Sequence, residues 1–343
     1  MKLNGLFLHN FRVFQSLEVN LFEKTFLFGS NGAGKTTILE AIYMLCWGKS
    51  FRASRDSEVI RQGETLSQIE GEFKGEEFYN VKLALAQRGK KIVLNGKHIS
   101  RAELIGKIPV LLLSPEELSM IDGPPKIRRS FLDRILSQMD SEYLLKYRSY
   151  LRLLKEKNAI LSKSKGYTKL LELIDERMLK LAFYIWEKRK KFLDSLEDTE
   201  IYIRFKPSGL NLSVDFDLMR RTLYSYRDKE IVRGFSLFGP HLDEFEIMRN
   251  GISLKKYGSR GERKWVMWRI YLKALRALAG SGIVPIFLID ELLAELDSIR
   301  KKEIWKDLSR LDCQVIMTSL FPERNDEFIM FEVKNGTLKR YNS

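Results

Sequence analysis

Several segments within the first hundred residues alternate between apolar and polar positions, which predicts β-strands. Residues 17–21 alternate in this way, and a short apolar strand at 26–28 leads into a glycine-rich loop. Residues 66–94 alternate again and end at Asn95-Gly96, a strong tight-turn signal, so an antiparallel sheet is expected there.

After the glycine-rich loop the apolar spacing becomes helical, and farther on two stretches space apolar residues alternately by three and four. This spacing is typical of the seam between packed helices. The first seam comprises Leu144, Tyr147, Leu151, Leu154, Asn158 and Leu161, and the second comprises Leu171, Ile174, Met178, Leu181, Ile185 and Phe192. The polar break at 162–166 permits the chain to reverse, so the pattern predicts an antiparallel helical hairpin.

Alternation returns beyond residue 200. Strands are expected at 201–205 and 210–214, buried parallel strands at 283–289 and 314–317, and helices at 262–279 and 300–311. The prediction is therefore an α/β fold whose first lobe, 1–113 with 201–343, is split in sequence. A mainly helical second lobe, 114–200, is inserted and contains the hairpin.

The glycine-rich loop fits the phosphate-binding pattern G-x-x-x-x-G-K-[ST] at every required position, between the predicted strand and helix. Its glycines let backbone N–H groups wrap phosphates, Lys35 is expected to reach the β- and γ-phosphates, and the Thr36 hydroxyl to ligate Mg²⁺. ATP and Mg²⁺ are thus the expected cofactors. The candidate nucleotide-binding residues are Gly29, Ser30, Asn31, Gly32, Ala33, Gly34, Lys35, Thr36 and Thr37.

A second candidate element is the apolar strand that ends in Asp290-Glu291. Ligand sites of α/β sheets lie at such carboxyl ends. Asp290 is placed to hold Mg²⁺ through water and Glu291 to orient or deprotonate the attacking water, with Lys35 completing the catalytic set. Two acids that merely favour a helix N-terminus remain the alternative.

Composition and charge narrow the class of protein. The formal net charge of +14 suggests a polyanionic partner such as nucleic acid. Two cysteines without a pairing pattern fit a reducing cytosol, so a cytoplasmic, nucleoid-associated protein is expected. No export signal is visible, and the apolar run 283–289 is far short of the roughly 20 residues that span a bilayer, so no membrane partner is expected.

The loop 258–262, Gly-Ser-Arg-Gly-Glu before a predicted helix, resembles the signature loop of ABC-type ATPases. By that resemblance Ser259 and Gly261 would bind the γ-phosphate of ATP held by a second copy, and 295–297 looks like the D-loop. By itself the loop is also compatible with an ordinary turn.

Within that class the chain resembles the RecF family over nearly its whole length. The residues that carry the likeness are Asn10-Phe11-Arg12, Leu39-Glu40-Ala41-Ile42-Tyr43, Ser50-Phe51-Arg52, Ser114-Pro115-Glu116-Glu117-Leu118, Gly123-Pro124, Arg128-Arg129, Phe131-Leu132-Asp133 and Gly239-Pro240-His241. The 224 positions between Lys35 and Ser259 leave room for a short hairpin, not for the long coiled coils of SMC and Rad50 relatives.

The resemblance implies an ATP-dependent homodimer that clamps double-stranded DNA near single-strand gaps or stalled forks. It also implies slow, DNA-stimulated hydrolysis for release, support of recombinase loading with RecO and RecR partners, and Arg12 as a further nucleotide contact. Three positions depart from the family pattern: Glu262 replaces the usual Gln, Leu242 a common basic residue, and Glu291 the second Asp of a usual pair.

The inserted lobe is a candidate DNA surface, because residues 126–206 contain 20 Lys and Arg against 12 Asp and Glu. The candidate DNA-binding residues are Arg148, Arg152, Lys155, Lys188, Arg189, Lys190 and Lys191, with Lys157, Lys163 and Lys165 in the same basic set. A solvated helical face is the simpler interpretation of any single lysine. Two other functions stay open: a transport-type ABC ATPase subunit, and a DNA scaffold that holds ATP without turnover.

Overall fold

The chain folds into two compact units, which are described separately. The computed structural model describes residues 1–163, 166–210, 215–323 and 325–341. One unit comprises residues 1–118 and 278–343, and the other comprises 119–277. The expected boundary at residue 200 therefore differs from the observed one. The reason is that β9 (Ile201–Lys206) pairs with β10 (Glu244–Arg249), which holds both strands in the second unit.

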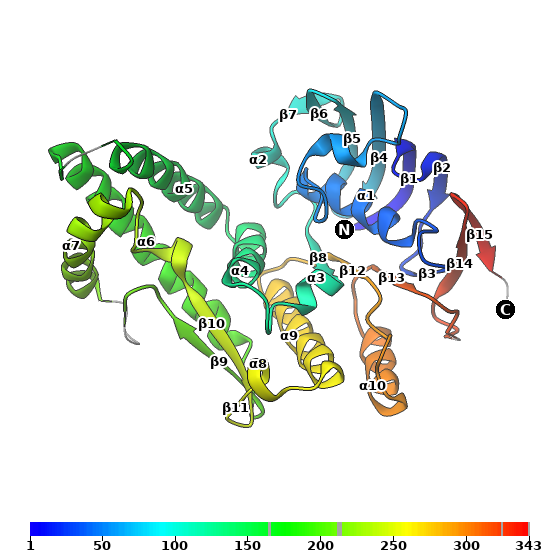
Figure 1. Ribbon diagram of the computed structural model, residues 1–343. Helices are drawn as coiled ribbons and strands as arrows, with labels where there is room; N and C mark the ends of the chain where they lie inside the picture. The colour runs from blue at the N-terminus through cyan, green and yellow to red at the C-terminus, as the bar shows by residue number, and fades with distance from the viewer. Residues whose placement is uncertain (164–165, 211–214, 324, 342–343) are drawn as a thin grey trace. The chain divides into compact units, whose positions relative to one another are not determined.

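The described part of the first unit contains two six-stranded sheets (Figure 1). The antiparallel sheet, β2-β1-β4-β5-β6-β7, comprises β1 (Lys2–Phe11), β2 (Phe14–Asn20), β4 (Leu66–Lys74), β5 (Phe78–Ala86), β6 (Gly89–Leu94) and β7 (Lys97–Ile99). The other sheet, β15-β14-β3-β13-β12-β8, comprises β3 (Lys24–Phe28), β8 (Val110–Leu113), β12 (Ile286–Ile289), β13 (Val315–Ser319), β14 (Ile329–Lys334) and β15 (Thr337–Tyr341). Its neighbours are parallel except for β14 and β15. The predicted turn is confirmed, since Asn95 and Gly96 both have positive φ.

Helix α1 (Lys35–Trp47) lies between the two sheets. Every residue of α1 except Thr36 is buried, as expected for a helix covered on all sides. One hydrophobic core joins Ile69 of the antiparallel sheet, Ile42 of α1 and Leu288 of the parallel sheet. In the described part of this unit the other α-helices are α2 (Arg101–Leu104), α3 (Pro115–Leu118) and α10 (Ser298–Ser309), and a 3-10 helix, η1, spans Asp56–Val59.

The second unit is mainly helical and includes a small sheet of β9, β10 and β11 (Ile252–Ser253). Its helices are α4 (Pro125–Met139), α5 (Ser141–Leu161), α6 (Lys169–Ser195), α7 (Phe216–Arg233), α8 (Leu254–Tyr257) and α9 (Arg260–Gly280), the last ending just inside the first unit. The strand predicted at 210–214 falls mostly on residues 211–214, which lie outside the described residues.

The predicted antiparallel hairpin of α5 and α6 is confirmed. Asp140, before α5, binds Lys188 near the end of α6, whereas Lys157 late in α5 binds Asp175 early in α6. The predicted α5 seam was wrong in register. Leu151 is 40% exposed, and the buried positions are Tyr143, Tyr150, Leu153, Lys157 and Leu161. Because α5 also contacts α4 and α7, its buried face is not set by α6 alone.

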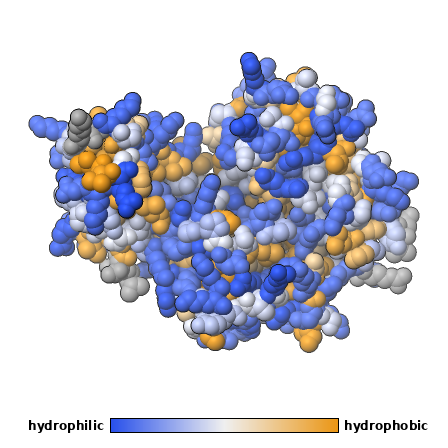
Figure 2. Space-filling model, viewed as in Figure 1, coloured by the Kyte–Doolittle hydropathy of each residue, from blue (hydrophilic) through white to orange (hydrophobic). Residues whose placement is uncertain are grey.

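Figure 2 shows a mostly hydrophilic face, with apolar residues in scattered patches. Within the described residues, no helix combines the length and the hydropathy needed to cross a bilayer.

Candidate nucleotide-binding site

The loop between β3 and α1 has a backbone that requires glycine. Gly29, Gly32 and Gly34 have φ of 151°, 79° and 114°, values that residues with a Cβ rarely adopt. A Cβ on Gly29 would lie 2.3 Å from the carbonyl oxygen of Val333, and one on Gly34 would lie 2.7 Å from the ring of Phe14. The sequence pattern therefore reflects both the φ values and the close packing around the loop.

Lys35, the first residue of α1, folds its side chain back over this loop. Its ammonium donates to the carbonyl oxygens of Gly29 at 2.8 Å and Ser30 at 3.1 Å, and it lies 3.9 Å from the carboxylate of Glu291. Burial lowers the pKa of Lys35, while the charges of Glu291 and Asp290 oppose that shift. Carbonyl oxygens thus hold the ammonium at the mouth of the loop, where a phosphate would compete for it.

Asp290 directly follows β12, and its carboxylate accepts hydrogen bonds from hydroxyl groups on two other elements. Thr36 Oγ1 donates to both of its carboxylate oxygens at 3.0 Å, and Thr318 Oγ1 from β13 donates to Oδ1 at 2.5 Å. Burial raises the pKa of Asp290, and the two hydroxyl groups partly offset this by stabilising the ionised form. The parallel pairing of β12 with β13 brings these side chains to one edge of the sheet.

Glu291 is held in an unusual backbone conformation beside this cluster. Its φ is 49°, sparsely populated for a residue with a side chain, and its N–H donates to Thr318 Oγ1 at 3.2 Å. The Glu291 side chain is 33% exposed, in contrast to buried Asp290. The two predicted acids thus differ in environment: one is fixed by hydroxyl groups, and the other faces solvent beside Lys35.

The set of groups at this edge fits a Mg²⁺–nucleotide complex. Magnesium in nucleotide sites takes one or two protein oxygens, with phosphate and water oxygens filling the remaining positions. Thr36 and Asp290 supply such oxygens side by side. Within the described residues no cluster of three or more acids, histidines or cysteines forms a separate metal site.

Three segments that resemble the RecF family meet at one buried carboxylate, that of Glu40. Arg12 donates to it through Nε at 3.0 Å and Nη2 at 2.8 Å, and Ser50 Oγ donates at 2.5 Å. Arg12 itself has a φ of 53°. The sequence predicted Arg12 as a nucleotide contact but missed Glu40, although an acid among the apolar residues of a helix is a signal of a buried partner.

The predicted signature residues lie in the second unit. Ser259 is exposed and caps α9, because its Oγ accepts a hydrogen bond from the Glu262 N–H at 3.2 Å. The Glu262 carboxylate binds Arg249 at 3.1 Å, and Arg249 also binds Glu200 at 3.0 Å. The unusual Glu262 therefore has a charged partner within its own unit.

The structure corrects part of the predicted DNA surface. Arg189 is fully buried and binds Asp133 at 2.7 Å and Asp243 at 2.6 Å, so it is unavailable to phosphate. Lys157 is equally buried between two acids, Asp175 and Glu230. The sequence around Arg189 and Lys157 did not indicate that these side chains are buried, because the acids that pair with them lie elsewhere in the sequence.

The other predicted cations remain accessible to different degrees. Lys188 is 40% exposed but binds Asp140 at 2.6 Å, a contact that also raises the pKa of Lys188. The exposed cations of the set are Arg148, Arg152, Lys155, Lys163, Lys190 and Lys191. Lys165 lies outside the described residues.

Comparisons with known proteins agree with the fold. The model of the RecF/RecN/SMC N-terminal domain family matches residues 2–328. The DNA replication and repair protein RecF of Macrococcus caseolyticus is 34% identical over 331 residues, with 89% of each chain covered. The protein of the same name from an Exiguobacterium species is 31% identical, with 99% of each chain covered. A solved structure of the recombination mediator protein RecF with ATP, from the RecFOR pathway, has a TM-score of 0.89 at 25% identity and covers 99% of this chain and 97% of that one. The chain therefore belongs to the RecF family of ABC-type ATPases.

Proposed function

We propose that the chain is an ATP-driven DNA clamp of recombinational repair. The observation that supports the ATP-driven part most directly lies beside the phosphate-binding loop. There the hydroxyl groups of Thr36 and Thr318 both donate hydrogen bonds to the carboxylate of Asp290. Glu291 and Lys35 lie next to this group. The relatives named for DNA replication and repair support the DNA function, and the RecF structure with ATP supports nucleotide binding.

In this proposal the residues of the site have distinct roles. Gly29 to Thr37 and Arg12 bind the nucleotide, and Lys35 neutralises charge on the β- and γ-phosphates. Thr36 and Asp290 hold Mg²⁺, which when bound offsets the negative charge of the phosphates. Glu291 orients the attacking water and accepts its proton, a role that suits a carboxylate open to solvent.

The signature loop supplies the remaining contacts in trans. Ser259 and Gly261 of a second copy bind the γ-phosphate, so ATP joins two chains head to tail. Ser259 suits this role because it is exposed at the start of α9, where main-chain N–H groups favour an anion. The dimer closes on duplex DNA near single-strand gaps, and slow hydrolysis releases it. RecO and RecR proteins are the expected partners in recombinase loading.

The decisive test uses Glu291→Gln, which keeps the size of the side chain and removes its charge. Phosphate release should fall by at least about a hundredfold, the typical effect of losing a general base. ATP should still bind, and gel filtration with ATP should show a lasting dimer. Glu64→Gln, an exposed carboxamide substitution in the same unit, serves as the control. A monomer at saturating ATP would contradict the shared-site model.

If the chain is instead a scaffold that holds ATP without turnover, the parent protein and Glu291→Gln should release phosphate at the same rate. The DNA function is tested separately, by duplex binding with ATP, ADP or no nucleotide across a salt series. Tighter binding with ATP supports the clamp, whereas equal binding in all three states would separate DNA binding from the ATPase.

A further inference from the structure

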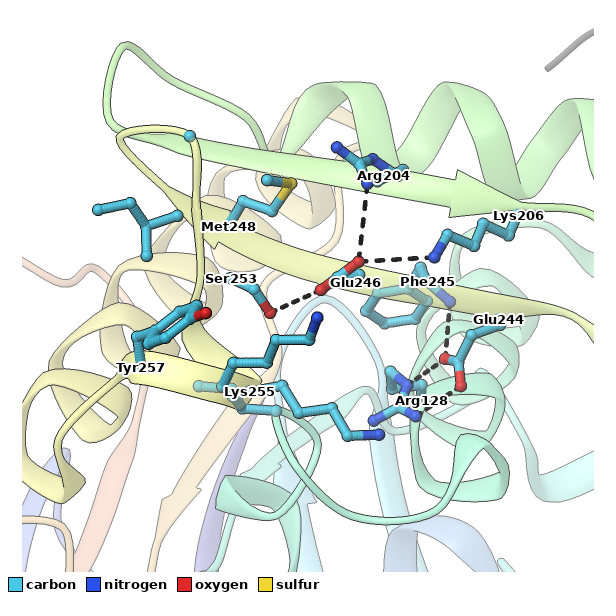
Figure 3. A pocket seen from close by; sticks show the side chains of 14 residues that line it. Arg128, Arg204, Lys206, Glu244, Phe245, Glu246, Met248, Ser253, Lys255 and Tyr257 are labelled. Atoms are coloured by element: carbon cyan, nitrogen blue, oxygen red, sulfur yellow. Dashed lines mark hydrogen bonds and ion pairs between the residues drawn. The ribbon is translucent and has the colours of Figure 1, made fainter.

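A basic pocket opens on the second unit, and the last of its lining residues, Tyr257, precedes Ser259 of the signature loop by two positions. It has a volume of 660 Å³ and is formed by β9, β10, β11 and α8, with Arg128 from α4 (Figure 3). Five cationic side chains line it against two acidic ones. The pocket is thus large enough for a nucleotide and carries an excess of positive charge.

The two acidic side chains already have partners, which leaves the positive charge in excess. The guanidinium of Arg128 donates two hydrogen bonds to the carboxylate of Glu244, one through Nε and one through Nη2 at 2.7 Å. Glu246 accepts a hydrogen bond from Ser253 at 2.6 Å and lies 3.5 Å from Lys206, contacts that lower its pKa. Figure 3 shows both carboxylates engaged by these neighbours.

Four exposed cations surround these acids. Arg204 and Lys206 lie on the same face of β9, because they are two residues apart, and their side chains are 46% and 53% exposed. Lys255 and Lys256 on α8 are exposed, and in the described part of the chain neither ammonium has an acidic partner within ion-pair distance. Lys255 and Lys256 are therefore free to bind phosphates, and Arg204 and Lys206, which share the carboxylate of Glu246, add positive charge beside them.

The pocket also presents an aromatic ring to solvent. Tyr257 is 75% exposed and Ile252 is 56% exposed, and Met248 also lines the pocket. A ring beside clustered cations is the combination by which proteins hold single-stranded nucleic acids, since bases stack on the ring while cations neutralise the backbone. Duplex bases are already stacked on each other and cannot reach such a ring.

We propose that this pocket binds single-stranded DNA, with a base on Tyr257 and phosphates at Lys255, Lys256 and Lys206. An acidic peptide would also use the ammonium groups, but it would leave the aromatic ring without a role. The inference deepens the proposed function, because a protein that acts at gaps meets the single strand beside the duplex. The guanidinium of Arg263 donates to the main-chain carbonyl oxygens of Leu254 and Lys255 and so anchors the backbone of α8, so we expect substitutions of its exposed side chains to leave the fold in place.

The test measures the anisotropy of a labelled oligothymidine without nucleotide, so that ATP-driven dimerisation plays no part. Tyr257→Ala should weaken binding by about tenfold, and Tyr257→Phe should bind like the parent protein, because the ring remains. The double variant Lys255→Glu, Lys256→Glu should weaken binding further and flatten its salt dependence. Lys339→Glu, an exposed charge reversal in the other unit, should have little effect.

Two results would overturn the proposal. One is oligothymidine binding that is unchanged in Tyr257→Ala and in the double lysine variant. The other is competition by polyglutamate with no effect of Tyr257→Ala, which would assign the pocket to an acidic peptide. Tyr257-dependent binding together with absent ATP-dependent duplex binding would refute the clamp and leave the pocket assignment intact. ATP-dependent duplex binding with Tyr257-independent oligothymidine binding would refute the pocket assignment and leave the clamp intact.

Discussion

Thr36 and Asp290 are 254 positions apart in the chain, yet the Thr36 hydroxyl lies 3.0 Å from each oxygen of the Asp290 carboxylate. The first residue follows the phosphate-binding loop and the second follows β12. A shared metal ion would bring these two side chains to the same place, so this contact is the structural basis for assigning Mg²⁺ to them.

Removal of the Thr36 hydroxyl should weaken Mg²⁺ binding, so that the ATPase needs a higher concentration of the ion. We expect Thr36→Ala to raise the Mg²⁺ concentration needed for half-maximal activity by at least about tenfold, whereas Thr36→Ser retains the hydroxyl and stays close to the parent. Phosphate release across a Mg²⁺ titration measures this. An identical titration for Thr36→Ala would remove the residue from the metal site.

Arg189 should prove to be a structural residue rather than a DNA contact. Arg189→Met leaves Asp133 and Asp243 buried without their cation, which should lower the free energy of unfolding by about 3–5 kcal/mol. Lys190→Met, next to it but exposed, should change that energy by less than about 0.5 kcal/mol. Urea unfolding of both variants decides between the roles, and similar stabilities would contradict the buried network.

Lys190 and Lys191 are the better candidates for duplex DNA, because both are exposed on α6. The double variant Lys190→Glu, Lys191→Glu should weaken duplex binding and reduce the slope of log affinity against log salt by about 2. The same experiment with the double variant Lys302→Glu, Lys306→Glu, two exposed reversals on α10, controls for net charge. A salt slope equal to that of the parent would exclude the two lysines from the duplex interface.

Glu262 departs from the usual Gln of the signature loop, but its carboxylate is directed to Arg249. Since Arg249 also binds Glu200 and stacks on Trp265 at 4.6 Å, Glu262→Gln should change the free energy of unfolding by less than about 1 kcal/mol. We expect the ATPase rate to stay within about threefold, the equivalent of under 1 kcal/mol in the barrier. A much larger rate change would place the Glu262 side chain at the nucleotide.

His241 should make stability depend on pH. Burial lowers its pKa from 6.5 to about 4, with the charges of Lys157, Arg129 and Arg189 acting in the same direction. The unfolded state therefore binds more protons between these pH values, so the contribution is fully present above pH 6.5 and is lost as pH falls towards 4. At about 1.4 kcal/mol per pH unit, the loss is on the order of 3 kcal/mol.

Asp243 acts in the opposite direction, because its burial raises its pKa to about 6. The contribution of His241 is isolated by comparison with His241→Gln, which cannot titrate. Urea unfolding at pH 7 and pH 5 should show a smaller loss of stability in the variant. Equal losses in both proteins would show that the histidine is not titrating as described.

Local patterns predicted the elements of the fold well. The strand, loop and helix at 24–47 and the hairpin of α5 and α6 both formed as expected. Periodicity and glycine spacing are local properties, because they follow from side-chain alternation and from φ values open to glycine. The α5 register was predicted less well: Tyr150 rather than Leu151 is buried, and α5 contacts α4 and α7 as well as α6.

The sequence by itself thus determined the phosphate-binding loop, the acids that directly follow β12 and the family to which the chain belongs. Only the tertiary structure decided which charges are available. Arg189 and Lys190 are neighbours in one basic run, yet the first is buried between two carboxylates and the second faces water. The physical reason is that a charge is buried only where partners offset its loss of hydration. Those partners, Asp133 and Asp243, come from positions that no local pattern connects.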